Sequence, residues 1–177
     1  MIVKVGTPAP LFRAEGYRRG DGEAVIVDLT AYRGRWVVLF FYPRDFTFVC
    51  PTELHAFAGL EGAFAEEDAA VIAASTDSYW SHKAWFESHP LLADVAYPIV
   101  ADTTHDIADA YDVLSPDGSA LRGTFVIDPA GILRHASVTD QSVGRSPDET
   151  LRILQALRTG ELCPVAWRKG DDVLKAA

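Results

Sequence analysis

The sequence predicts an α/β protein with a three-layer arrangement of helices around a central, mixed β-sheet. Apolar, β-rich segments alternate along the chain with segments that carry apolar residues at helical spacing. Two late strand candidates are joined by a tight turn, which indicates an antiparallel pair in the same sheet. The chain has 177 residues, 49% of them hydrophobic, which suits one domain large enough to bury a core.

The first clear strand candidate is Trp36–Tyr42, which is apolar on both faces, as a strand in the middle of a sheet would be. Residues 51–67 follow with apolar side chains at helical spacing, and Ala69–Ser75 has the character of a second buried strand. Together they predict a strand-helix-strand unit. The pattern then repeats with a helix at Tyr79–Ser88, a short strand at Tyr97–Val100 and a helix at Thr104–Tyr111.

After residue 120, two consecutive strand candidates replace the alternation of strands and helices. Gly123–Asp128 and Ile132–Val138 are strand candidates that flank the turn Pro129-Ala-Gly131, which predicts an antiparallel hairpin. A last helix is expected from about Pro147 to Arg158, and its start and end are both well marked. Its boundaries are indicated by the capping-box pair Ser146 and Glu149, by Pro147 in the first turn and by Gly160 after the end.

This order of elements matches a thioredoxin-like domain with an N-terminal extension and additional elements. We expect the domain to span residues 1–163 and a C-terminal arm, with few apolar residues, to span residues 164–177. Asp117-Gly118 is interpreted as a turn.

The composition limits the classes of function. The net charge is −9, with 16 basic against 25 acidic residues, so nucleic acid and anionic membranes are poor partners. The longest strongly apolar run, Trp36–Tyr42, is far shorter than the roughly 20 residues that cross a bilayer. Residues 1–10 contain Lys4 and two prolines where a secretory signal needs an unbroken apolar segment. We therefore expect a cytoplasmic location.

Cys50 and Cys163 are the two cysteines of the chain, which fits a reducing compartment. Such a pair indicates redox chemistry more often than a structural disulfide, but the composition leaves both possible. The sequence contains no Cys-x-x-Cys motif, and two cysteines with five scattered histidines offer no zinc-binding spacing. We expect neither a metal nor another cofactor on the chain.

Cys50 stands directly before Pro51 and after the strand candidate Trp36–Tyr42, which places its sulfur at a helix N-terminus near the carboxyl end of a central strand. The unpaired N–H groups and the positive dipole end of a helix favour a thiolate over a thiol. A nucleophilic cysteine is one interpretation of this position. The other is a small, buried apolar residue, which would be favoured for an isolated cysteine.

Pro43 precedes Thr47 by four residues, and Thr47 precedes Cys50 by three. This Pro-x-x-x-Thr-x-x-Cys segment resembles the active-site segment of the peroxiredoxins, which are thiol-dependent peroxidases. The resemblance implies that the Thr47 hydroxyl, the Cys50 backbone N–H and an arginine hold the two peroxide oxygens in line with the sulfur. It also implies that Pro43 packs over the thiolate and limits water. Taken singly, Thr47 would be interpreted as a cap or turn residue and Pro43 as a strand end.

Arg122 lies just before the predicted strand Gly123–Asp128. It matches the peroxiredoxin position that brings a guanidinium to the sulfur. A fixed cation there stabilises a thiolate and binds oxygen. Arg44 is the competitor in sequence, although the family has no catalytic arginine at that place. Glu53 and Arg145 also match family positions, and the resemblance implies that they orient Arg122.

Cys163 lies in Glu161–Trp167, with the sequence Glu-Leu-Cys-Pro-Val-Ala-Trp, just after the last predicted helix. This segment resembles the resolving segment of typical two-cysteine peroxiredoxins, in which the second thiol comes from the other subunit of an antiparallel dimer. The sulfenic acid left by attack on a peroxide condenses with such a thiol. The resemblance therefore implies a Cys50–Cys163 disulfide between two chains.

The resemblance extends from about Val5 to Leu174, and the chain is similar to the bacterial alkyl hydroperoxide reductase C branch. Between Asp112 and Leu121 the chain lacks the Gly-Gly-Leu-Gly insert of peroxide-sensitive members, and it stops at Ala177 without their Tyr-Phe helix. We expect an enzyme that resists overoxidation.

The family further implies hydrogen peroxide and organic hydroperoxides as substrates and a homodimer assembled into a ring of five dimers. The implied electron donor is a thioredoxin-like or flavoprotein disulfide reductase. A holdase chaperone and a redox sensor that uses the same two thiols are the alternative functions, and the sequence does not rank the possible peroxides or reductants.

Overall fold

The computed structural model describes residues 3–21 and 23–175. The predicted domain and arm also include five residues that lie outside the described residues: Met1, Ile2, Gly22, Ala176 and Ala177. The strands are β1 (Arg13–Tyr17), β2 (Val25–Asp28), β3 (Trp36–Phe41), β4 (Ala69–Ser75), β5 (Ile99–Ala101), β6 (Arg122–Ile127) and β7 (Leu133–Thr139). The helices are α1 (Cys50–Gly59), α2 (Glu61–Glu66), α3 (Tyr79–Ser88), α4 (Asp106–Ala110) and α5 (Pro147–Thr159), with 3-10 turns η1 (Leu29–Tyr32) and η2 (Pro90–Leu92).

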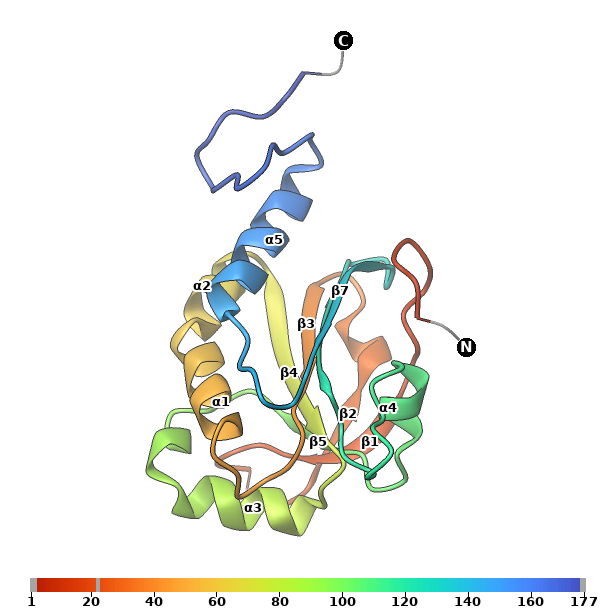
Figure 1. The fold of residues 1–177 in the computed structure, drawn as a ribbon, viewed down its shortest axis with the longest axis vertical. Helices are drawn as coiled ribbons and strands as arrows, with labels where there is room; N and C mark the ends of the chain where they lie inside the picture. Colours follow the sequence, from red (N-terminus) through yellow and green to blue (C-terminus); the bar gives the residue numbers. More distant parts are fainter. Residues whose placement is uncertain (1–2, 22, 176–177) are drawn as a thin grey trace.

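The described strands form one sheet in the order β2-β1-β5-β4-β3-β6-β7 (Figure 1). Strand β4 pairs in parallel with β3 and β5, whereas β6 pairs antiparallel with β3 and β7, so the sheet is mixed. The predicted strand after Arg35 is interior to the sheet, between β4 and β6. These findings confirm the predicted mixed sheet, the interior strand and the antiparallel hairpin.

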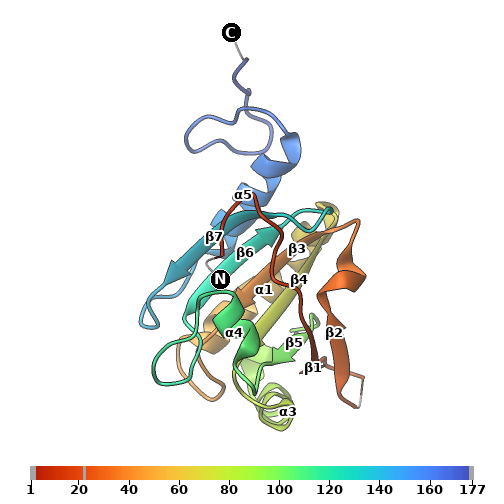
Figure 2. The same cartoon turned by 90° about the vertical axis from the view of Figure 1, so that its right-hand side faces the viewer.

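Helices cover both faces of the sheet, which makes the predicted three layers. Helices α1, α2 and α5 pack on one face, and α4 lies with the N-terminal segment on the other (Figures 1 and 2). Strand β3 serves both cores because its side chains alternate. Val38 and Phe40 belong to the core under α1, and Leu39 and Phe41 belong to the core under α4.

Two features differ from the predicted elements. The single helix expected over residues 51–67 is two helices, α1 and α2, which are separated at Leu60 with φ −105° and ψ 2°. The sequence offers a reason, because Gly59 and Gly62 flank the break and glycine weakens a helix interior. The N-terminal hairpin of β1 and β2 was not predicted, and it joins the sheet through antiparallel pairing of β1 with β5.

Helix α5 begins and ends where the sequence indicated. The Ser146 hydroxyl accepts a hydrogen bond from the Glu149 N–H at 3.3 Å, and Gly160 ends the helix with a left-handed φ of 69°. The following segment is anchored, because the Leu174 N–H donates to the Leu162 carbonyl at 2.8 Å and closes a loop. Lys169 in this loop also pairs with the buried carboxylate of Glu67, at 2.5 Å.

No helix among residues 3–21 and 23–175 has the length and apolar character that a bilayer crossing requires.

Candidate active site

Cys50 is the first residue of α1 and is 1% exposed. The loop 42–49 connects it to β3, so the sulfur lies beyond the carboxyl end of an interior strand. Val49, the cap residue, makes no side-chain hydrogen bond to the helix start, and Pro51 occupies the first turn. The helix therefore begins at the cysteine itself, with the positive end of its dipole at the thiol.

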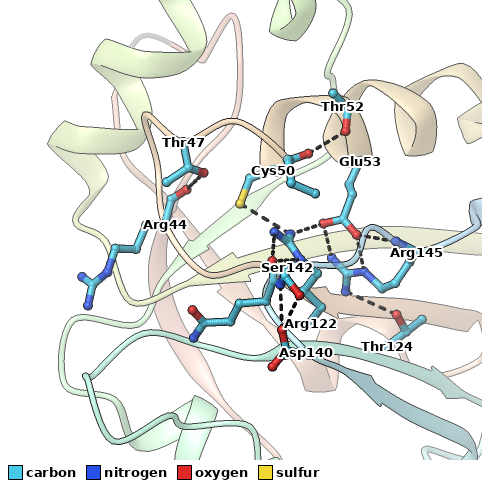
Figure 3. A network of polar contacts seen from close by, with 12 residues as sticks. Arg44, Thr47, Cys50, Thr52, Glu53, Arg122, Thr124, Asp140, Ser142 and Arg145 are labelled. Atoms are coloured by element: carbon cyan, nitrogen blue, oxygen red, sulfur yellow. Dashed lines mark hydrogen bonds and ion pairs between the residues drawn. The ribbon is translucent and has the colours of Figure 1, made fainter.

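Arg122 brings a positive charge to this sulfur. It is the first residue of β6, the antiparallel neighbour of β3, and its side chain is 3% exposed. Its Nη1 atom lies 3.5 Å from the Cys50 Sγ atom and 2.5 Å from Glu53 Oε2 (Figure 3). Its Nε and Nη2 atoms both donate to the Gln141 carbonyl, at 2.9 and 2.6 Å. The guanidinium is thus fixed on three sides.

Glu53 is the buried acceptor that holds two arginines together. It stands three residues after Cys50 in α1, on the same face of the helix. Besides Arg122, it accepts from the Arg145 backbone N–H at 2.7 Å and from Arg145 Nε at 2.9 Å. Burial alone would raise the pKa of Glu53, but the hydrogen bonds and charge of Arg145 and the charge of Arg122 outweigh it and lower the pKa. The carboxylate is therefore ionised at neutral pH.

Arg145 contacts the Glu53 carboxylate from the side opposite Arg122 and is itself held by further contacts. Its Nη1 atom donates to the Gly123 carbonyl at 2.8 Å, directly after Arg122 in β6. Its guanidinium carbon also lies 5.1 Å from the centre of the Phe40 ring in β3. The structure thus brings Cys50, Glu53, Arg122 and Arg145 into one contact network (Figure 3).

The loop before Cys50 carries the other residues singled out in the sequence. Pro43 is buried at the start of the loop. The Thr47 hydroxyl donates to the Arg44 carbonyl at 2.9 Å, so its proton is directed to the loop backbone (Figure 3). The exposed guanidinium of Arg44 donates to the Asp117 carbonyl, at 2.9 Å. Of the two candidate arginines, Arg122 contacts the sulfur.

Gln141 is a residue of the site that the sequence did not indicate. Its carbonyl accepts both hydrogen bonds from Arg122, and its side-chain amide donates to the buried Ser119 hydroxyl at 2.8 Å. A main-chain acceptor can belong to any residue type, so no signal in the sequence could have pointed to it.

Cys163 lies in the loop after α5 and is half-buried. Its sulfur is 3.4 Å from the Thr159 hydroxyl and 3.7 Å from the Ala156 carbonyl. Both cysteines are free. Figure 1 shows the segment after α5 beyond one end of the molecule, whereas the loop that enters α1 lies near the opposite end.

Across the described residues, no group of three or more His, Cys, Asp or Glu side chains is arranged to hold a metal ion.

A thiol with an arginine against its sulfur, and with no second cysteine three residues away, is suited to reduce an oxidant directly rather than to exchange disulfides. Sulfur attack on an O–O bond is assisted by a cation that stabilises the departing oxygen, and the Arg122 guanidinium stands next to the sulfur here. The fold and this site together define a thiol-dependent peroxidase with a thioredoxin-like fold.

Comparison with known proteins leads to the same class. The model of the AhpC/TSA family matches residues 5–136, and the chain belongs to this family. The chain is 48% identical over 179 residues to the peroxiredoxin prdx-2 of Caenorhabditis elegans, covering 97% of this chain and 88% of that protein. It is 44% identical over 182 residues to the peroxiredoxin tpx1 of Schizosaccharomyces pombe, covering 98% and 94% of the two chains.

Solved structures agree in fold over nearly the whole length. The reduced 2-Cys peroxiredoxin of Plasmodium vivax superposes with a TM-score of 0.92 at 38% identity, covering 97% of this chain and 92% of that chain. The AhpC of Mycobacterium tuberculosis superposes with a TM-score of 0.85 at 34% identity, covering 95% and 100%. The predicted peroxiredoxin family, fold and peroxidase class are confirmed, and membership implies a hydroperoxide substrate and homo-oligomeric assembly.

Proposed function

We propose that the chain reduces hydrogen peroxide and organic hydroperoxides at Cys50 and that Cys163 of a second copy resolves the oxidised intermediate. The observation that carries this proposal is the contact of 3.5 Å between the Arg122 guanidinium and the Cys50 sulfur at the start of α1. The guanidinium is held by Glu53 and by the Gln141 carbonyl, so its charge is in place before the substrate arrives.

In the first step, the Cys50 thiolate attacks one peroxide oxygen and the O–O bond breaks. The sulfur is oxidised to a sulfenic acid, and the second oxygen leaves with the electron pair and takes up a proton to give water or an alcohol. Arg122 stabilises the negative charge that develops on the departing oxygen. Because the Thr47 hydroxyl donates its proton to the Arg44 carbonyl, we propose that its oxygen accepts a hydrogen bond from the substrate, and that the buried Pro43 limits the access of water to the sulfur.

In the second step, the thiol of Cys163 attacks the sulfenic sulfur, a disulfide forms and water leaves. In one chain, the segment after α5 and the loop that leads into α1 lie near opposite ends of the molecule (Figure 1). This separation supports a partner subunit as the source of the Cys163 thiol. An external dithiol, from a thioredoxin-like or flavoprotein disulfide reductase, then reduces the disulfide. Two free cysteines suit the reducing cytoplasm. We propose a ring of five dimers as the assembly.

Resistance to overoxidation belongs to the same proposal. The segment from Asp112 to Leu121 forms a compact turn, in which the Gly118 N–H donates to the Ser115 carbonyl at 2.9 Å and Leu114 pairs with Ala120. This short connection contacts the loop before Cys50 through the hydrogen bond of Arg44 to the Asp117 carbonyl. We expect sulfinic acid to form only at high peroxide concentrations.

Steady-state peroxide consumption with dithiothreitol as the reductant tests the central claim. Cys50→Ser should abolish turnover, because the alcohol is not oxidised by peroxide. Cys163→Ser should still turn over, since dithiothreitol can reduce a sulfenic acid directly. Turnover by Cys50→Ser at the wild-type rate would contradict the proposal.

A further inference from the structure

A buried polar cluster outside the reacting groups holds the loop that leads to Cys50. Its members are Tyr42 at the start of the loop, Asp45 within it and His82 in α3. The side chains of His82 and Asp45 are 0% and 1% exposed, and Tyr42 is 0% exposed. Titratable groups are rarely buried this completely unless they are paired, and no step of the proposed reaction uses them.

The contacts within the cluster converge on the Asp45 carboxylate. The Tyr42 hydroxyl donates to Asp45 Oδ1 at 2.8 Å, and His82 Nδ1 lies 2.9 Å from Asp45 Oδ2. The other ring nitrogen, Nε2, lies 3.2 Å from the Val100 carbonyl in β5. Burial and the charge of Asp45 raise the pKa of Tyr42 well above its ordinary value, so its hydroxyl remains a donor. Through its two ring nitrogens, His82 links the loop to α3 and β5.

The backbone of the loop is fastened at the same residue. The Asp45 N–H donates to Asp77 Oδ2 at 2.9 Å, and Asp77 accepts a second bond from the Ser75 hydroxyl, at 2.8 Å. Both groups stand at the carboxyl end of β4. Asp45 is therefore anchored through its main chain to β4 and through its side chain to α3.

The next residue shows why such an anchor is needed. Phe46 has a φ of 55°, in the left-handed region that a non-glycine residue adopts only under constraint. Phe46 is 61% exposed as a residue, so burial compensates little for this conformation. The loop would relax without the bonds at Asp45, and Thr47 and Cys50 lie one and four residues further along.

The loop must also be released during the catalytic cycle. The Cys50 side chain is 1% exposed, so its sulfur cannot reach a cysteine of another chain unless the start of α1 and the loop move. Attack on peroxide requires the held arrangement, and formation of the interchain disulfide requires the released one. A buried hydrogen-bonded network is well suited to such a choice, because it specifies one geometry of the loop.

We propose that Asp45 and His82 are positioning residues that hold the loop before Cys50 in the arrangement that reacts with peroxide, and so set the balance between peroxide attack and disulfide formation. The inference rests on the proposed function, since it concerns the two steps assigned to Cys50. Neither residue touches the sulfur or the substrate. Each acts through the position of Thr47 and Cys50.

Two substitutions of His82 separate the contact with Asp45 from the contact with Val100. His82→Asn keeps an amide nitrogen near the place of Nδ1, toward Asp45, whereas His82→Gln places its amide near Nε2, toward Val100. Asp45→Asn weakens the pair from the other side. The matched control is Ile72→Ala in β4, a fully buried residue of the other core, which lowers stability without touching the loop.

The readouts are the rate of the first oxidation of reduced enzyme by hydrogen peroxide, followed by tryptophan fluorescence, and the ratio of disulfide to sulfinic acid, measured by intact mass. Asp45→Asn and His82→Gln should slow the first step by about tenfold or more, because the reacting groups are misplaced. They should also shift the products toward disulfide. His82→Asn should recover most of the rate, and Ile72→Ala should change neither readout.

The possible failures are distinguishable. Wild-type rates and product ratios in both Asp45→Asn and His82→Gln, or equal changes in Ile72→Ala, would overturn the inference while the peroxidase activity stands. If Asp45→Asn does not fold, the inference is tested by the difference in oxidation rate and product ratio between His82→Gln and His82→Asn. A wild-type chain whose Cys50 is not oxidised by peroxide would contradict the proposed function and this inference with it.

Discussion

Glu53 shows how one buried side chain can prepare a cysteine for chemistry without touching it. It compensates two guanidinium groups in a site with almost no exposed area, and Arg122 reaches the sulfur only because Glu53 and the Gln141 carbonyl fix its orientation. Removal of one member of a buried ion pair leaves an uncompensated charge, which typically costs about 3–5 kcal/mol. The residue is therefore important for both stability and reactivity.

Arg122→Lys should lower the rate constant for oxidation of Cys50 by hydrogen peroxide by about 100-fold. The lysine keeps the charge but has one ammonium group, which cannot contact the sulfur, Glu53 and the Gln141 carbonyl together. Stopped-flow tryptophan fluorescence measures this rate. Arg44→Lys is the control and should react as the wild type does, because Arg44 is exposed and bonded to Asp117. Equal losses in the two variants would contradict the assignment.

The lowered pKa of Glu53 predicts a pH-dependent contribution to stability. A carboxyl group whose pKa is lower in the folded than in the unfolded state stabilises the fold above its unfolded pKa. For Glu53 the ordinary value is 4.5, so its contribution is complete at neutral pH and disappears as the pH falls below 4.5 through the folded pKa. Glu53→Gln should lower the free energy of unfolding by roughly 3 kcal/mol at pH 7 and by much less at pH 3.

Urea unfolding at the two pH values measures this difference. Glu149→Gln is the matched control, since Glu149 is paired with Arg152 on an exposed helix surface and such pairs contribute little. A constant difference between the wild type and Glu53→Gln at both pH values would show that the charge of Glu53 is not what stabilises the site.

The residues of the site were predictable from the sequence to different degrees. Cys50, Arg122, Glu53 and Arg145 were all named, and the structure brings them together. The direction of the Thr47 hydroxyl proton was not predictable, because it depends on the local path of the loop. The contact of Asp45 with His82 joins residues 37 positions apart, so no local pattern could indicate it.

Among the secondary-structure elements, those with the strongest periodicity were predicted well. Strands β3 and β4 are continuous apolar runs, and α5 has a capping residue and a terminal glycine. The hairpin of β1 and β2 was missed because its strands are short and carry charged and exposed residues. It lies at an edge of the sheet, where burial leaves a weak pattern in the sequence.

Helix α5 provides a prediction at the scale of one element. Ser146→Ala removes the hydroxyl that accepts the Glu149 N–H, and it should lower the free energy of unfolding by about 1 kcal/mol. Urea denaturation followed by circular dichroism measures the loss. Ser88→Ala in α3 should have a smaller effect, because the Ser88 hydroxyl donates to carbonyls of its own helix and caps no free N–H group. A larger loss in Ser88→Ala would contradict the capping role.

At the scale of the whole molecule, the separation of the two cysteines within one chain predicts the form of the oxidised enzyme. The segment that carries Cys163 extends beyond α5, away from the α1 entrance (Figure 1). Protein treated with one equivalent of hydrogen peroxide should therefore run as a covalent dimer on a non-reducing gel. Cys163→Ser should abolish this band, and so should Cys50→Ser.

An oxidised wild-type chain that migrates as a monomer with an internal disulfide would show that the resolving thiol comes from the same subunit. Retention of the dimer band in Cys163→Ser would instead indicate a Cys50–Cys50 bond between chains.

The interruption between α1 and α2 at Leu60 limits how far a movement at Cys50 can spread. The Tyr97 hydroxyl donates to the Leu54 carbonyl at 2.7 Å, which fastens the middle of α1 to the core, and α2 begins as a separate helix. We therefore expect the first turn of α1 to move outward while α2 and the parallel strands remain packed. Such a movement would expose the reactive sulfur in each cycle without opening the hydrophobic interior to water, and exposure of that interior is what promotes aggregation.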